Sequence, residues 1–307
     1  HSMTKKPKIV IIGGPTAVGK SALAVNLAEK FNGEVVGADS MQIYRRLNIG
    51  TGKITGIETH GIRHRMIDIL EPDERYSVGQ YLIDASNEID KVLSLNKLPV
   101  IVGGTALYLN AIINGMNFSD ADRSDEVREK WKNIASEHGN QFVYDCLTKI
   151  DPESAVKISV NDVKRTIRAI EIYEVTGKPK SQTATTNDCK YDYEFFIMTR
   201  ERNDLYRAIE TRVDKMFDDG LIDEVKSLEH YKECQSMQAI GYKQLCEYFC
   251  GKFDSLDAVK DEIKKLSRNY AKRQMTFFRG MSANKTFVDF LNANDETAKI
   301  VNGFLSE

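Results

Sequence analysis

The 307-residue sequence lacks the long apolar runs that membrane helices need. No stretch approaches the roughly 20 consecutive apolar residues that cross a bilayer. No charged and then apolar leader precedes Ile9, so nothing directs the chain out of the cytoplasm. We therefore expect a cytoplasmic protein that has no membrane partner.

Cysteine and histidine are also scarce and unpatterned. The five cysteines are odd in number and show no C-x-x-C spacing, and the five histidines form no cluster of ligands. This excludes a zinc site and a disulfide framework, and it suits reduced thiols in a cytosol.

The composition that remains is that of an ordinary globular protein. With 41% hydrophobic and 29% charged residues, the chain can bury one large core or two unequal ones. The formal net charge of −2 hides an asymmetry, because the segment from Lys260 to Lys285 holds eight basic and two acidic residues.

Apolar runs alternate with helical patterns in the first third of the chain. Lys8 to Gly13 reads as a buried strand, and Ser21 to Phe31 has helical spacing. Two further apolar runs, Glu34 to Ala38 and Pro99 to Val102, flank a helical stretch from Val78 to Leu95. This alternation predicts an α/β fold with a P-loop and a doubly wound parallel sheet, which binds ligands at the carboxyl ends of its strands.

The pattern changes at about residue 118. Charged helical segments follow until Tyr191 to Thr199, which reads as a strand returning to the sheet. We predict a P-loop core in two parts, residues 4–117 and 191–307, the second with C-terminal helices. Residues 118–190 form an all-helical insertion between them.

One loop carries a phosphate-binding motif. The sequence from Gly14 to Ser21, GPTAVGKS, matches G-x-x-x-x-G-K-[ST] between a strand and a helix. Its glycines let backbone N–H groups turn toward phosphate oxygens, while Lys20 adds a charge and Ser21 a ligand for Mg2+. The predicted diphosphate-binding residues of this loop are Gly14, Pro15, Thr16, Ala17, Val18, Gly19, Lys20 and Ser21.

Polar residues at the other strand ends leave several roles open. Asp39 can hold Mg2+, cap the following helix or act as a base. The third strand ends in two glycines and Thr105, without the Asp that many P-loop NTPases use to activate water, which weakens a hydrolase interpretation. Thr105 offers a hydroxyl to the crevice or caps a helix.

The segment from Lys260 to Gly280 predicts an amphipathic helix. At about 100° per residue, one face is basic, with Lys265, Arg268, Lys272 and Arg279. The opposite face is apolar, with Ile263, Leu266, Tyr270 and Phe277. The basic face is either solvated or a track for a phosphate backbone.

Seven phrases in order resemble one family, the tRNA dimethylallyltransferases. They are GPTAVGKS (14–21), DSMQIYR (39–45), VGGTALYL (102–109), NDVKRTIRAIEIYEVTGKP (161–179), RVDKMFDDGLIDEV (212–225), QAIGYKQL (238–245) and YAKRQMTFFR (270–279). They cover nearly the whole chain. The resemblance implies transfer of a dimethylallyl group from dimethylallyl diphosphate to N6 of adenosine 37 in tRNA, with Mg2+.

The resemblance also implies roles for individual residues. The loop and Arg212 would bind diphosphate, Asp39 would be the base, and Lys20 and Thr105 would complete the catalytic group. The helical insertion would grip the anticodon stem-loop, and we expect a monomer. The implied tRNA contacts are Asp39, Ser40, Met41, Gln42, Thr105, Arg128, Lys164, Arg165, Thr166, Ile167, Arg168, Gln238, Ala239, Ile240, Gly241, Tyr242, Lys243, Ala271, Lys272, Arg273, Gln274, Met275, Thr276, Phe277 and Phe278.

The chain departs from the family pattern in small ways. Gly52 stands where the family usually has Ala, and Phe277 where it usually has Trp. The zinc-finger tail of eukaryotic members is missing, which indicates a bacterial-type enzyme. Three rival functions remain: an adenylate dimethylallyltransferase, a small-molecule P-loop kinase, and a non-catalytic RNA-binding NTPase switch.

Overall fold

The computed structural model describes residues 5–115, 124–177, 179–182 and 189–307. Contacts divide the chain into two compact units. The first comprises His1–Tyr76, Ile83–Ile113 and Cys189–Glu307, and the second Ser77–Leu82 and Asn114–Asp188. The predicted boundary at residue 118 falls outside the described residues, so the three-part division stays a prediction.

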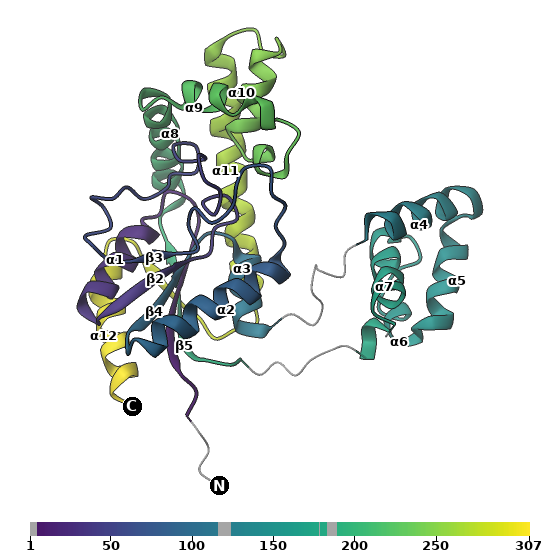
Figure 1. Cartoon of the computed structure of the whole chain (residues 1–307), viewed down its shortest axis with the longest axis horizontal. Helices are drawn as coiled ribbons and strands as arrows, with labels where there is room; N and C mark the ends of the chain where they lie inside the picture. Colours follow the sequence, from purple (N-terminus) through teal and green to yellow (C-terminus); the bar gives the residue numbers. More distant parts are fainter. Residues whose placement is uncertain (1–4, 116–123, 178, 183–188) are drawn as a thin grey trace. The chain divides into compact units, whose positions relative to one another are not determined.

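The first unit is built on a parallel six-stranded sheet with the order β3-β2-β4-β1-β5-β6 (Figure 1). The strands are β1 (Lys8–Gly13), β2 (Gly33–Gly37), β3 (His64–Arg65), β4 (Leu98–Val102), β5 (Asp192–Thr199) and β6 (Thr286–Asp289). The predicted α/β class with a parallel sheet is therefore confirmed. The edge strands β3 and β6 were not predicted, because two and four residues are too short to show a period.

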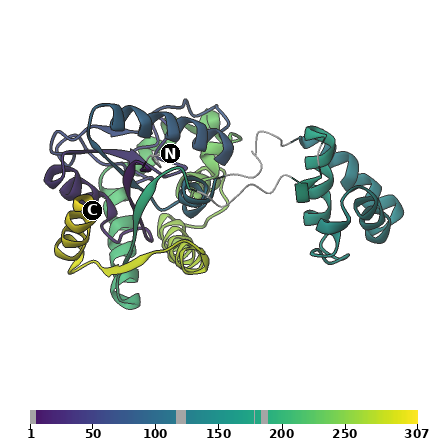
Figure 2. The ribbon, with the colours of Figure 1, turned by 90° about the horizontal axis from the view of Figure 1, so that it is seen from below.

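Helices cover both faces of the sheet (Figure 2). Val10 and Ile12 of β1 share a buried cluster with Leu23 of α1 and Val301 of α12. On the other face, the ring of Phe195 in β5 meets that of Phe278 in α11 edge-on, with centroids 6.4 Å apart. A strand buried on both faces reads as a continuous apolar run, which explains the pattern of β1.

The helices around this sheet extend beyond its carboxyl edge and belong to the first unit, except for residues 78–82 of α2 and the last residue of α3. They are α1 (Lys20–Lys30), α2 (Val78–Ser94), α3 (Ala106–Asn114), α8 (Arg202–Asp218), α9 (Leu221–Ser227), α10 (Tyr242–Phe249), α11 (Leu256–Gly280) and α12 (Ala293–Ser306), with short 3-10 turns η3 (Glu229–Tyr231) and η4 (Gln235–Gln238). Helices α8 to α11 form a further core with Ile43, Tyr44 and Leu47. This core anchors the segment that follows β2.

Helix α11 begins after Ser255, whose hydroxyl accepts the N–H of Ala258 at 3.1 Å. Its last turns bury Ala271, Gln274, Met275 and Phe278, at helical spacings of three and four residues. The periodic pattern placed Phe277 on the apolar face of this helix, but Phe277 is 43% exposed, as a residue that contacts RNA must be. Neighbouring helical residues point about 100° apart, so Phe277 turns outward where Phe278 turns inward.

The second unit is helical. Its helices are α4 (Asp125–His138), α5 (Asn140–Ile150), α6 (Pro152–Ala155) and α7 (Val163–Thr176), followed by the turn η2 (Lys180–Gln182). The carboxylate of Glu171 is fully buried and accepts from Arg128, Arg168 and the N–H of Ser124. Burial alone would raise the pKa of Glu171, but these hydrogen bonds hold it below its ordinary value.

Within the described part of the chain, no helix combines the length and the apolar character that a membrane span requires.

Candidate active site

A cavity of about 1010 Å³ lies in the first unit, beyond the carboxyl ends of β1, β2 and β4. Its walls come from the loop after β1, the segments 39–42 and 50–52, Gly103 and Gly104, and helices α8 and α11. The three strand ends that were expected to face one crevice therefore do so. The volume is at the upper end of the usual range for ligand pockets, which leaves room for more than one small group.

The glycine-rich loop makes a tight turn from β1 into α1. Ala17 and Gly19 have positive φ angles of 64° and 96°. A Cβ on Gly14 would come within 2.9 Å of the carbonyl oxygen of Met198, so this position requires glycine. The turn places the first N–H groups of α1, which have no helical partner, at the cavity wall.

Lys20 carries its ammonium group into this wall. Its Nζ donates to the carbonyl oxygen of Pro15 at 2.7 Å. Burial, together with repulsion from Arg212, lowers the pKa of Lys20 to about 7, and the charge of Asp39 opposes that shift. A bound anion would offset this repulsion and restore the charge.

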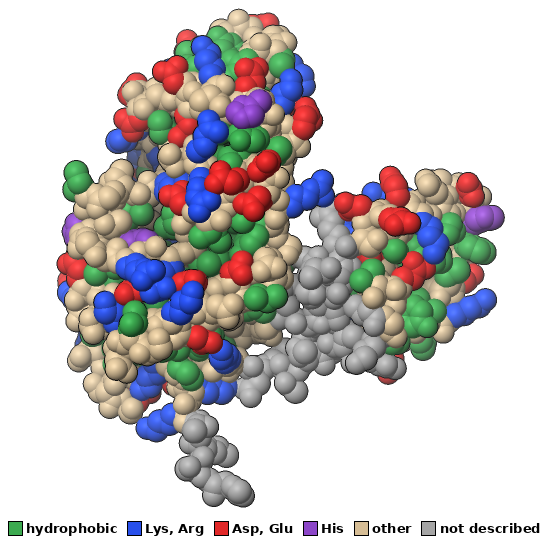
Figure 3. Space-filling view, viewed as in Figure 1, with side chains coloured by type: hydrophobic (Ala, Val, Ile, Leu, Met, Phe, Trp, Pro, Cys, Tyr) green, Lys and Arg blue, Asp and Glu red, His purple; other side chains and the backbone are tan. Residues whose placement is uncertain are grey.

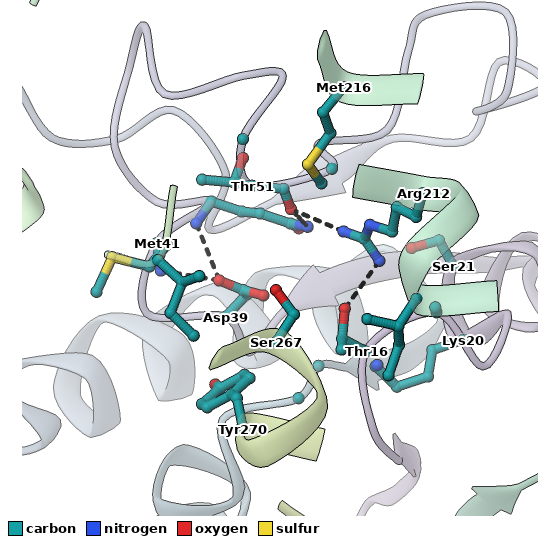
Figure 4. Close-up of a pocket in the computed structure, with 18 of the residues that line it drawn as sticks. Thr16, Lys20, Ser21, Asp39, Met41, Thr51, Arg212, Met216, Ser267 and Tyr270 are labelled. Carbon is teal, nitrogen blue, oxygen red and sulfur yellow. Dashed lines mark hydrogen bonds between the residues drawn. The ribbon is translucent and has the colours of Figure 1, made fainter. Parts of the chain in front are cut away.

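Arg212 reaches the same place from α8. Its Nη1 donates to Thr16 Oγ1 at 3.0 Å and its Nη2 to the carbonyl oxygen of Thr51 at 3.3 Å. Figure 4 shows Lys20, Ser21 and Arg212 gathered around Thr16, with Asp39 across the cavity. Burial lowers the pKa of Arg212, and Asp39 again opposes the shift.

Gly52 provides the space for this arginine. Its φ angle is 61°, and a Cβ there would lie 1.8 Å from Arg212 Nη2. The difference from the alanine usual in the family therefore bears directly on the position of the guanidinium group.

Asp39 follows β2 and uses one carboxylate oxygen to shape the chain. Its Oδ1 accepts the N–H groups of Met41 at 2.8 Å and of Gln42 at 3.0 Å. This oxygen therefore closes a turn over residues 40–43, and the expected helix cap was wrong because the described residues directly after Asp39 form no helix. In the described part of the chain, Oδ2 takes part in no hydrogen bond, so it is available to a metal ion or a substrate proton.

Thr105 links the ends of two strands. Its Oγ1 accepts the N–H of Ser40 at 2.9 Å and donates to Ser40 Oγ at 3.3 Å. Tyr270 of α11 lies close by: burial and the charge of Asp39 raise the pKa of Tyr270 to about 12, while hydrogen bonding with Thr105 opposes the shift. The phenol is therefore neutral at physiological pH.

Gln274 joins two loops of the site from α11. Its Oε1 accepts the N–H of Thr16 at 3.0 Å, and its Nε2 donates to the carbonyl oxygen of Gly104 at 3.0 Å. The side chain is only 6% exposed. The resemblance placed it among the tRNA contacts, whereas the structure turns it inward.

A protein cage for a metal ion is absent from the described residues, where no three His, Cys, Asp or Glu side chains gather. Ser21, the second residue of α1, lines the cavity instead. Mg2+ typically keeps several waters and binds through substrate phosphates with one or two protein ligands. A single hydroxyl beside a phosphate-binding loop fits that preference.

The other implied tRNA contacts of the first unit divide by exposure. Gln238 and Lys243 are exposed, Ala239 and Ile240 are half-buried, and Gly241 is buried. The Tyr242 side chain is fully buried, and its hydroxyl donates to Glu224 at 2.5 Å. On α11 the exposed residues are Lys272, Arg273, Thr276 and Phe277, and the buried ones are Ala271, Gln274, Met275 and Phe278.

Six implied tRNA contacts belong to the second unit. Lys164 and Arg165 are exposed on α7, while Thr166 and Ile167 are buried. Arg128 and Arg168 are half-buried because both pair with Glu171. The most accessible cations of this set are therefore Lys164 and Arg165.

Sequence reasoning missed part of the cavity wall. Thr51, Met216, Ser267 and Tyr270 line the cavity but were not assigned to the site. One face of α11 carries Ser267, Tyr270 and Gln274 at helical spacing. The sequence period could therefore have identified them as a group. Met216 lies one helical turn after Arg212 on α8, so its position also carried a signal. Thr51 carried none, because only the fold brings it to the cavity.

The sequence matches a family model described as IPP transferase over residues 42–281. It is 44% identical to a tRNA dimethylallyltransferase of Thermoanaerobacter sp. (strain X514), an alignment that covers 97% of this chain and 98% of the relative. It is 46% identical to a tRNA dimethylallyltransferase of Caldanaerobacter subterraneus subsp. tengcongensis, with 91% of each chain covered.

Solved structures agree with these sequence matches. The full-length tRNA isopentenylpyrophosphate transferase from Bacillus halodurans superposes with a TM-score of 0.74 at 40% identity, covering 98% of this chain and 97% of the other. A eukaryotic dimethylallyltransferase acting on tRNA gives a TM-score of 0.83 at 30% identity, covering 98% of this chain and 80% of the other.

Proposed function

The chain belongs to the IPP transferase family, and we propose that its cavity holds dimethylallyl diphosphate against the loop of residues 14–21. The chain transfers the dimethylallyl group to N6 of adenosine 37 in tRNA, which yields N6-dimethylallyladenosine and diphosphate. One observation carries the proposal. Lys20 and Arg212 hold adjacent residues of the loop, Pro15 and Thr16, across the cavity from the carboxylate of Asp39 (Figure 4).

The leaving group explains the cationic wall. As the bond from the prenyl carbon to the diphosphate oxygen breaks, negative charge grows on the diphosphate. The loop N–H groups, Lys20 and Arg212 are aimed at that charge in a site partly closed to water, where such interactions are strong. A water-activating Asp after β4 has no role in this reaction, which agrees with its replacement by Gly103 and Gly104.

Ser21 would be the protein ligand of Mg2+ in this site. When bound, Mg2+ adds positive charge against the diphosphate oxygens. The chain's contribution is to present one hydroxyl at the start of α1 and to leave the remaining positions to phosphate and water.

On the acceptor side, Asp39 and Tyr270 line the cavity, and Thr105 is hydrogen-bonded to Ser40 of the cavity wall. The adenine amine is a poor nucleophile because its lone pair is delocalised into the ring, so proton removal accompanies attack. Asp39 Oδ2 would take the N6 proton, since Oδ1 is already occupied by two N–H groups. Adenosine 37 must leave its stack to reach the cavity, at a few kcal/mol, which is lowest in a single-stranded loop.

The finer features of tRNA binding follow from exposure. Lys272, Arg273 and Phe277 on α11 would contact the RNA, and a phenylalanine still stacks on a base although less strongly than tryptophan. Lys164 and Arg165 in the second unit would hold the anticodon stem-loop. The enzyme would act as a monomer.

A transfer assay tests the function. Labelled dimethylallyl diphosphate is incubated with Mg2+ and either total tRNA or AMP, and label on tRNA alone is expected. Label on AMP would identify an adenylate dimethylallyltransferase. Turnover of ATP without prenyl transfer would favour a kinase or an NTPase switch and contradict the proposal.

A further inference from the structure

Gln274 lies on the helix with the exposed cations Lys272 and Arg273, yet its own side chain turns inward to the diphosphate loop. We propose that Gln274 is a positioning residue, which fixes the spacing between the diphosphate-binding loop and the acceptor side of the cavity. The inference rests on the proposed function, and the experiments below distinguish a failure of the inference from a failure of the proposed function.

One peptide group of the loop is held from both sides. The carbonyl oxygen of Pro15 accepts from Lys20 Nζ at 2.7 Å, and the N–H of Thr16 donates to Gln274 Oε1 at 3.0 Å. A diphosphate competes with Pro15 for the ammonium group of Lys20. Gln274 then remains as the side chain that holds this peptide in place.

The other end of the amide holds the chain just before Thr105. Gln274 Nε2 donates to the carbonyl oxygen of Gly104 at 3.0 Å. A Cβ on Gly104 would lie 2.5 Å from that nitrogen, whereas its next nearest atoms are 3.5 Å away or more. The approach is therefore close enough to exclude any side chain at position 104 unless the amide moves.

One side-chain amide thus holds both loops, so the residue at position 274 must accept one hydrogen bond and donate another. Glutamine supplies both, and methionine of similar length supplies neither. Because Gly104 precedes Thr105, release of the amide would let the loop and the Thr105–Ser40 pair move apart. A misplacement of about 1 Å between reacting groups can lower a rate by 10²-fold.

The first test is Gln274→Met, assayed in single turnovers with saturating dimethylallyl diphosphate and tRNA. We expect the rate to fall roughly 10- to 100-fold, while the KM for tRNA changes by less than about threefold. The matched control is Thr297→Val on α12. Thr297 is fully buried and its hydroxyl donates to the carbonyl oxygen of Ala293 at 2.5 Å, outside the cavity lining, so this variant loses a buried hydrogen bond and should keep its rate within about twofold.

The second test disturbs the same hydrogen bond from the opposite side. Gly104→Ala should displace the amide and slow transfer to a similar extent, and the double variant should be no slower than the slower single one. Additive losses, or a Gln274→Met rate equal to wild type, would overturn the proposal. A wild-type enzyme without transfer activity would instead refute the proposed function. Gly104→Ala also keeps the proposal testable if Gln274→Met does not fold.

Discussion

At the scale of single residues, the site stores unfavourable charge at Lys20. Because its pKa is lowered to about 7, the folded protein below pH 7 carries a buried ammonium group beside the positive charge of Arg212. The unfolded chain binds this proton up to about pH 10.4, so the group's contribution to stability rises as pH increases from about 7 to 10. Binding of an anion beside Lys20 would offset the same repulsion without loss of the proton.

Lys20→Met should therefore stabilise the fold while it disables the enzyme. Transfer should fall by orders of magnitude, because the variant has no charge to meet the leaving diphosphate. The melting temperature should rise relative to wild type at pH 6, and the gain should shrink toward pH 10. Thermal unfolding across this pH range checks the sign, and near-normal turnover would contradict the role of the loop.

Asp39→Asn tests which role the carboxylate has. Asparagine retains Oδ1 for the N–H groups of Met41 and Gln42, so the local fold should survive. It cannot accept a proton at neutral pH, and transfer should fall on the order of 10²- to 10⁴-fold with both substrates still bound. Single-turnover rates across a Mg2+ titration decide the matter, since full rescue by metal would mean that Asp39 is a metal ligand and not the base.

At the scale of elements, α11 serves both sides of the reaction. Its inward stripe of Ser267, Tyr270 and Gln274 lines the cavity, and Lys272 faces solvent. Arg273 is exposed and also forms part of the cavity wall. The guanidinium group of Arg273 lies 5.8 Å from the ring centroid of Tyr270, within the range of a cation–π interaction. This contact joins the exposed face of the helix to its cavity-lining face.

Replacing Lys272 and Arg273 together with Ala should weaken tRNA binding and leave dimethylallyl diphosphate affinity unchanged. The slope of log affinity against log salt should fall by about 0.7 to 0.9 for each phosphate that the variant no longer neutralises. The control is Lys30→Ala with Lys299→Ala, which removes two exposed cations from α1 and α12. If the two variants bind tRNA equally across a salt series, the basic face of α11 is only solvated.

At the scale of the whole molecule, the numbers of basic and acidic residues are nearly equal, 43 and 45. Figure 3 shows basic and acidic side chains interspersed on the visible face, as a net charge of −2 allows. RNA affinity must therefore come from particular exposed cations, since binding depends on where charge sits. In the second unit, Arg128 and Arg168 are engaged with Glu171, which leaves Lys164 and Arg165 as the predicted contacts.

The double substitution Lys164→Ala and Arg165→Ala should raise the KM for tRNA several-fold without changing the single-turnover rate at saturation. Both residues belong to the second unit, whereas the cavity belongs to the first. Lys132→Ala with Lys149→Ala removes the same charge from exposed positions on α4 and α5 and should have a smaller effect. Equal effects of the two pairs would show that only net charge matters.

Sequence by itself determined the parts that depend on local chemistry and period. Continuous apolar runs specified β1, β2, β4 and β5 within one or two residues, and a glycine-rich motif marked the turn into α1. The position of Asp39 and Thr105 after strands was enough to place both at one edge, because parallel strands share their carboxyl ends. The α/β class and the resemblance followed from these local features.

Tertiary structure alone decided which side chains meet. Thr16 and Gln274 are 258 residues apart, and Thr16 and Arg212 are 196 apart, so no local period relates them. Phe277 and Gln274 exchanged their expected surroundings, because the packing of Met275 and Phe278 into the core sets the rotation of α11. A periodic pattern predicts that a helix has an apolar face. The elements that pack against the helix decide which residues at the edges of that face are buried. In α11 this packing turns Gln274 toward the diphosphate loop.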